Sequence, residues 1–275
     1  MVAEPAWRRW VRTYLVVTFF LVAYVFSWSV WLVAVPLAAG AGPGARAAVH
    51  YVGLCGPTVA AVILSDWLHG RGGVGELLGR IARWRVGVGW YLFALLSTLA
   101  VGLAAVGLHA LVRGTRPPFD FAFIAAQLIL PAGLPEEFGW RGFALPHLLK
   151  KRGAVAASLV IALFWVLWHL PISPALRNPP VLVLFLIEVS ALSILFSWLY
   201  INSGGSVLLV VLYHFVANHM VRMLSIPAAP TLWLMYVVLL WVVAGVVIFR
   251  YGGASLTRLA SARAAIGPAE RAPGA

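Results

Sequence analysis

Two adjacent carboxylates, Glu136 and Glu137, lie in an apolar stretch of the sequence and are followed by Arg141. A charged side chain at the centre of a bilayer costs about 2.5–3.5 kcal/mol on insertion scales, so such residues usually line a polar cavity and serve a function. On a helix, Glu137 and Arg141 share a face and can pair, whereas Glu136 points roughly 100° away. One carboxylate is therefore free for chemistry, while the other can be neutralised in a structural ion pair.

Two further apolar segments carry polar residues at helical spacing. Trp165 and His169 are four residues apart in one segment, and His214 and Asn218 are four apart in the other. A lone histidine in such a segment is more often a hydrogen-bonded core residue than a catalyst. Together with the two glutamates, however, these residues favour one intramembrane site that is lined by three helices.

The composition places these motifs in a membrane protein. Of the 275 residues, 63% are hydrophobic and only 10% are charged, against about 25% charged in soluble domains. The net charge of +12 flanks the apolar segments, which fits contact with anionic lipid headgroups and argues against nucleic acid as a partner. The single cysteine, Cys55, excludes an internal disulfide and is interpreted as a small packing residue.

The predicted fold is an all-α, polytopic bundle with about eight transmembrane helices, because backbone in lipid must satisfy its own hydrogen bonds. Pro131 and Pro135 interrupt the fourth apolar segment just before the glutamates, which predicts a broken or kinked helix there. The eight segments are Tyr14–Val35, Ala47–Trp67, Trp90–Val112, Phe121–Leu149, Ala154–Ile172, Val181–Ile201, Ser206–Met223 and Leu232–Phe249.

The distribution of basic residues predicts the orientation. Most of them fall at 8–12, 71–85, 150–152 and 250–271, which are on one side of the membrane if the eight segments are correct. The positive-inside rule then places both termini in the cytoplasm. Within the second of these groups, Glu76–Val86 is expected to form either an interfacial helix or a loop.

This pattern divides the chain into three parts. They are a cytoplasmic N-terminal segment (1–13), a transmembrane domain (14–251) with its motif core at 134–218, and a disordered cytoplasmic tail (252–275). An Ala-, Gly- and Arg-rich composition favours a bacterial origin, and hence the bacterial inner membrane.

The order of the three motifs resembles the CPBP family, which comprises CAAX prenyl endopeptidases and bacteriocin-processing or immunity (Abi-like) homologues. The motifs are EExxxR at 136–141, an aromatic residue four before histidine at 165–169, and HxxxN at 214–218, each on its own apolar segment. The family usually has phenylalanine at the aromatic position, where this chain has Trp165.

The resemblance implies an intramembrane endopeptidase that hydrolyses a peptide bond of a membrane-associated peptide. Glu136, assisted by His169, would activate a water molecule as general base. His214 and Asn218 would donate hydrogen bonds to the oxyanion of the tetrahedral intermediate. Three further residues would support the site: Glu137, Arg141 and Trp165.

A metal-dependent alternative would use Glu136, His169 and His214 as ligands of a divalent ion such as zinc. The sequence has no HExxH motif, and these segments contain no two histidines four residues apart. We therefore favour a mechanism without metal and predict no other cofactor.

Two readings without proteolysis stay open. A secondary transporter would use Glu136, Glu188 and His169 as a proton relay, whereas a non-catalytic family member would act as a membrane scaffold or immunity factor. Whatever the function, Glu188 is expected either to line a cavity or to pair with a basic group, and His219 is interpreted as structural. The sequence leaves open whether the substrate is a prenylated CAAX peptide or a leader peptide, and it does not indicate the oligomeric state.

Overall fold

The computed structural model describes residues 5–37, 40, 42–116, 118–119 and 133–258. These residues form helices joined by turns and contain no β-strand, so the predicted all-α class is confirmed. The α-helices, in chain order, are α1 (Ala6–Thr13), α2 (Leu15–Ser29), α3 (Val35–Leu37), α4 (Pro43–Leu54), α5 (Gly56–His69), α6 (Arg71–Gly79), α7 (Val88–Arg113), α9 (Gly133–Gly139), α10 (Leu145–Leu149), α11 (Ala154–Trp168), α12 (Pro179–Asn202), α13 (Val207–Met223) and α14 (Pro230–Tyr251). Shorter turns are π-helical at Val30–Ala34 and Trp140–Ala144, and 3-10 at Pro174–Arg177 and Ile226–Ala228.

Among the described residues, four helical stretches are long and apolar enough to cross a membrane: Leu15–Leu37, Val88–Arg113, Pro179–Asn202 and Pro230–Tyr251. A fifth arises if α4 and α5, which meet at an angle of 41°, form one bent span. The chain is thus a multi-pass membrane protein, but the prediction of about eight spans is not confirmed.

Two local features explain why the described residues contain fewer than eight membrane-spanning helices. Helices α11 and α13 have 15 and 17 residues, fewer than the roughly 20 that a straight crossing needs. Residues 121–132 of the predicted fourth span, including Pro131, lie outside the described residues. The rest of that span consists of α9, the π-helical turn Trp140–Ala144 and α10.

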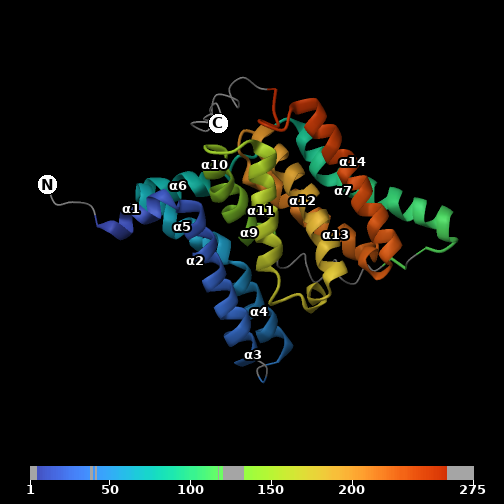
Figure 1. Ribbon diagram of the computed structural model, residues 1–275, viewed down its shortest axis with the longest axis horizontal. Helices are drawn as coiled ribbons and strands as arrows, with labels where there is room; N and C mark the ends of the chain where they lie inside the picture. Colours follow the sequence, from blue (N-terminus) through green and yellow to red (C-terminus); the bar gives the residue numbers. More distant parts are fainter. Residues whose placement is uncertain (1–4, 38–39, 41, 117, 120–132, 259–275) are drawn as a thin grey trace, which may run out of the picture.

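The helices surround the segment that carries the two glutamates. Figure 1 shows α9, α11, α12 and α13 in the centre, with α7 and α14 along one side and α2 with α4 projecting beyond the bundle. Helix α5 packs against both α2 and α9, α12 packs against α11 and α14, and α13 packs against α7 and α9. The short helix α9 is therefore enclosed by longer neighbours.

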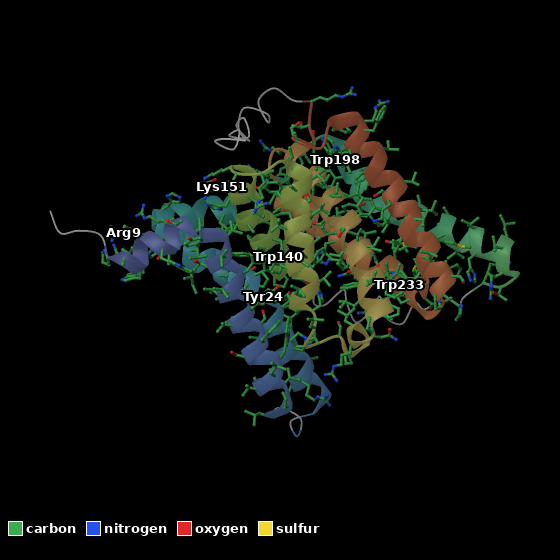
Figure 2. All side chains as sticks on the ribbon, in the orientation of Figure 1. Arg9, Tyr24, Trp140, Lys151, Trp198 and Trp233 are labelled. Carbon is green, nitrogen blue, oxygen red and sulfur yellow. The ribbon has the colours of Figure 1, made fainter. Side chains whose placement is uncertain are left out.

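Aromatic residues of α2 fasten the C-terminal half of α11. The Tyr24 hydroxyl donates to the carbonyl of Phe164, and Trp28 Nε1 donates to the carbonyl of Trp168 at 3.1 Å. Phe20 stacks on Phe164, with ring centroids 4.1 Å apart. Figure 2 labels Tyr24 in this region. Since the donors and the acceptors are both four residues apart, the two helices are held in register.

Residues that follow α14 fasten the other end of α11. The backbone N–H groups of Ala154 and Val155 donate to the carbonyls of Ala254 and Gly253, at 2.8 and 3.0 Å. These bonds satisfy first-turn donors that have no partner within the helix. We call residues 252–258 the C-terminal clamp.

The C-terminal clamp is also bonded to the end of α12. Asn202 Nδ2 donates to the Leu256 carbonyl and the Thr257 hydroxyl donates to Asn202 Oδ1, both at 2.8 Å. Leu256 and Thr257 are fully buried. The prediction of a disordered tail from Gly252 onwards is therefore not met by residues 252–258, and residues 259–275 lie outside the described part of the chain.

The connection between α5 and α7, for which the sequence predicted either an interfacial helix or a loop, combines a short helix with irregular chain. Helix α6 begins at Arg71 and ends at Gly79, so it covers only the start of the run Glu76–Val86. The rest of that run forms turns and irregular chain. The last residue of α6 is Gly79, and glycine weakens a helix by about 1 kcal/mol relative to alanine.

Candidate active site

Glu136 lies in the first turn of α9 and is buried, with 2% of its surface exposed. Trp165 Nε1, from α11, donates to Glu136 Oε2 at 2.7 Å. The residue before Glu136 is fixed as well, because the Thr58 hydroxyl of α5 donates to the Pro135 carbonyl at 2.5 Å. Helix α11 thus holds the carboxylate of Glu136, and α5 holds the backbone directly before it.

Glu137 and Arg141 form the expected pair. Arg141 Nη1 lies 3.0 Å from Glu137 Oε1 and 3.1 Å from Oε2, and both side chains are fully buried. Arg141 Nη2 donates to the Ser193 hydroxyl at 2.9 Å, and that hydroxyl donates to the Ser158 carbonyl at 2.7 Å. A buried ion pair needs such additional hydrogen bonds to offset its desolvation.

Two aromatic rings cover the Arg141 guanidinium. Its Cζ atom lies 5.1 Å from the ring centroid of Trp165 and 4.9 Å from that of Phe196. These distances are within the range of cation–π interactions. Arg141 itself lies in the π-helical turn Trp140–Ala144, a kind of distortion that often occurs at functional sites.

His214 of α13 joins this ion pair. Its Nδ1 atom lies 2.9 Å from Glu137 Oε1, and the side chain is 3% exposed. Because an ionised carboxylate can only accept, Nδ1 is the nitrogen that carries a proton, and Nε2 is left for another partner. The ring also packs against Gly133, where an added Cβ atom would lie 2.9 Å from His214 Cγ.

His169 caps the C-terminus of α11, one turn after Trp165. Its Nδ1 atom lies 2.7 Å from the Trp165 carbonyl, which can only accept, so a neutral ring has its lone pair on Nε2. Trp165 therefore contacts Glu136 through its indole and His169 through its carbonyl. The side chain of His169 is half-buried, between Trp168 and Phe185.

Two further polar residues of α13, Asn218 and His219, lie outside the cluster around Glu136 and Glu137. Asn218 is exposed on α13, one turn after His214, and so is not buried with Glu136 and His214. His219 is buried, and its Nδ1 atom lies 2.6 Å from the Phe215 carbonyl, which agrees with a structural role.

Glu188 belongs to a different part of the bundle. It is buried in α12, and its Oε2 atom accepts a hydrogen bond from Trp233 Nε1 of α14 at 2.6 Å. Figure 2 labels Trp233 near one end of α14. The sequence left open a basic partner for Glu188. Among the described residues, the bond to Glu188 comes instead from the indole of Trp233.

The proposed metal ligands do not come together as a metal centre. In the described part of the chain, no three His, Cys, Asp or Glu side chains are grouped so that they can hold an ion. Two of the candidate ligands are engaged elsewhere, since His214 bonds to Glu137 and Glu136 bonds to Trp165.

Several contacts at this site were absent from the sequence-based prediction. The His214–Glu137 bond, the Ser193–Arg141 bond and the Thr58 bond to Pro135 each join positions far apart in the chain. The only local signal was Trp165, which stands where the family usually has phenylalanine and brings a donor that phenylalanine lacks.

Comparisons with known proteins support the assignment of the motifs. Residues 117–220 match the family described as Rce1-like, type II CAAX prenyl endopeptidase. The chain is also 27% identical over 116 residues to CAAX prenyl protease 2 of Methanococcus maripaludis, a match that covers 39% of this chain and 42% of the relative. The chain therefore spans less than half the length of that curated relative. The matched residues include all three motifs, and the two comparisons confirm the resemblance to the CPBP family of intramembrane proteases.

Proposed function

We propose that this chain is an intramembrane endopeptidase that hydrolyses a peptide bond of a membrane-associated peptide. The observation that carries the proposal is the bond from Trp165 to Glu136. It holds a buried carboxylate beside the helix that ends in His169. The neighbouring Glu137 is already bonded to Arg141 and His214, so the two carboxylates differ in environment and can differ in role.

In the proposed first step, a water molecule loses a proton to Glu136 and its oxygen attacks the carbonyl carbon of the scissile bond. His169 assists through Nε2, which its bond to the Trp165 carbonyl leaves as the acceptor. When the tetrahedral intermediate collapses, the C–N bond breaks and the proton held by Glu136 passes to the leaving amine. The products are a carboxyl group and a free amine.

His214 and Asn218 are the proposed donors to the oxyanion. Since the Nδ1–H group of His214 is used by Glu137, Nε2 can donate only when the ring carries a second proton. Asn218 is exposed one turn away, so its amide is free of the buried cluster and can contact a bound peptide from the more accessible side.

The substrate and the orientation are part of the same proposal. The name of the relative from Methanococcus maripaludis favours a CAAX-type, prenylated peptide, and a leader peptide is the other candidate. Both termini are proposed to be cytoplasmic, in a bacterial inner membrane, with lipids and the substrate peptide as partners. The basic residues that flank the apolar segments support this orientation.

The test is cleavage of a quenched-fluorescent, prenylated CAAX peptide by detergent-purified protein, with Glu136→Ala in parallel. We expect cleavage by the unmodified protein alone. Cleavage by both proteins would reject Glu136 as the base. Cleavage by neither, with a leader peptide also intact, would favour the non-catalytic scaffold or immunity factor. Proton-coupled uptake into proteoliposomes that Glu136→Gln abolishes would instead favour the transporter.

A further inference from the structure

The carbonyl group of Gly142 lacks the usual hydrogen-bond donor of an α-helix. Gly142 is buried in the π-helical turn, directly after Arg141. In a regular α-helix this carbonyl would accept a hydrogen bond from the N–H four residues later, but that residue is Pro146, which has none. Because buried carbonyl groups are almost always paired, a side-chain donor from elsewhere in the fold can take the place of this missing N–H.

Arg80 supplies this donor from the connection between α6 and α7. Its Nη1 atom donates to the Gly142 carbonyl and lies 3.1 Å from the Tyr200 hydroxyl of α12. Its Nη2 atom lies 2.7 Å from Glu76 Oε1, which is one turn earlier in the chain. The guanidinium is thus held from two sides while it contacts Gly142.

The backbone of Arg80 contacts the second helix of the site. The Val207 N–H, in the first turn of α13, donates to the Arg80 carbonyl at 3.0 Å. The Ser206 hydroxyl caps the same helix and donates to the Arg83 carbonyl at 2.7 Å. Helix α13 carries His214, so one residue outside the membrane motifs bonds to both segments that meet at the Glu137–His214 hydrogen bond.

We propose that Arg80 is a positioning residue for this site. Its guanidinium fixes the π-helical turn after the two glutamates, and its carbonyl fixes the start of α13, so that Glu137 and His214 meet at hydrogen-bonding distance. The role rests on the proposed endopeptidase function, although the placement that it describes is measurable without activity. Arg80 contacts neither the buried carboxylates nor His214 directly.

The test compares Arg80→Met with Arg80→Lys. Methionine keeps an unbranched side chain but no donor, whereas lysine keeps the positive charge and an ammonium group that can donate to the Gly142 carbonyl. We expect Arg80→Met to lower kcat about 10- to 100-fold, the scale on which a small misplacement of catalytic groups acts. KM should stay within about twofold, because no substrate contact is removed. Arg80→Lys should recover a substantial part of the lost kcat.

Arg85→Met is the matched control, because it removes the same charge from the same connection. The Arg85 guanidinium lies over the Trp84 ring, and the side chain is exposed. Its kcat should equal that of the unmodified protein. Equal losses in Arg80→Met and Arg85→Met, or an unchanged kcat in Arg80→Met, would overturn the proposal.

Hydrogen exchange supplies the readout that does not depend on activity. In Arg80→Met, peptides that cover 140–149 should exchange faster, while peptides that cover the membrane part of α7 should not change. Unchanged exchange at 140–149 would reject the role of Arg80 whatever the kinetics show. If exchange at 140–149 is faster but the unmodified protein cleaves no peptide, the positioning role of Arg80 stands and the proposed endopeptidase function is rejected.

Discussion

Trp165 Nε1 donates a hydrogen bond to Glu136 Oε2 at 2.7 Å, and so links the second motif of this chain to the first. An indole can only donate, so the bond requires the carboxylate as its acceptor and fixes the rotation of that group. The carbonyl of the same tryptophan accepts from His169. One residue therefore sets the placement of both groups that are proposed to activate water.

Replacing Trp165 by phenylalanine should lower kcat by about tenfold or more. The substitution keeps an aromatic ring but removes a hydrogen bond to a charged group, a kind of bond that contributes about 1.5–3 kcal/mol. Steady-state cleavage of the quenched peptide measures the effect. Because phenylalanine is the usual residue of the family, this experiment also asks whether the indole is a specific requirement of this chain.

Trp168→Phe is the control for that experiment. Trp168 is fully buried on the same helix, and among the described residues its Nε1 atom has no hydrogen-bond partner. The substitution therefore removes similar volume but no bond from the indole. If both variants lose the same activity, then packing, and not the bond to Glu136, explains the effect of Trp165.

Glu137→Gln should destabilise the protein strongly. The substitution leaves Arg141 buried without its counter-charge, and breaking a buried pair in this way costs about 3–5 kcal/mol. Thermal unfolding in detergent measures the change. Glu76→Gln breaks an ion pair with the same spacing, in which Glu76 is 61% exposed, and should cost at most about 1 kcal/mol. Similar unfolding midpoints for the two variants would contradict this ranking.

Gly133→Ala should reduce activity more than it reduces stability. The added Cβ atom would lie 2.9 Å from His214 Cγ, so the imidazole ring must move away from its bond with Glu137. Gly107→Ala, in α7, serves as control because no atom lies within 4 Å of the added Cβ. The expected result is a kcat loss of about tenfold or more for Gly133→Ala alone. Normal kcat in that variant would show that the position of His214 is unimportant.

Treatment with a chelator should leave activity unchanged. Within the described residues, no group of three candidate ligands is arranged to hold an ion, and the proposed mechanism uses only side chains and a water molecule. The measurement is kcat after exhaustive dialysis against EDTA, followed by addition of zinc. Loss of activity that zinc restores would favour Glu136, His169 and His214 as ligands in a different arrangement.

Spacing along a helix allowed part of the site to be predicted. Glu137 and Arg141 share a helix face, so their pairing followed from the sequence even though a π-helical turn begins between them. The burial of Glu136 and His214 followed from their apolar surroundings. The all-α class followed from the apolar composition. In lipid, backbone polar groups have no water to bond to, and a helix pairs them within one segment.

Contacts between distant segments were beyond the reach of the sequence pattern. The bonds from Trp165 to Glu136 and from Arg80 to Gly142 depend on how helices pack. The span count was also uncertain for a physical reason, because hydropathy records how apolar a segment is but not whether it bends or ends early. The 41° bend between α4 and α5 is an example.

The C-terminal clamp has a consequence for the order in which the protein matures. The first turn of α11 receives its acceptors from Gly253 and Ala254, which leave the ribosome only after every described helix has been made. The N-terminal hydrogen bonds of the helix that carries Trp165 and His169 can therefore form only after α14 has been made.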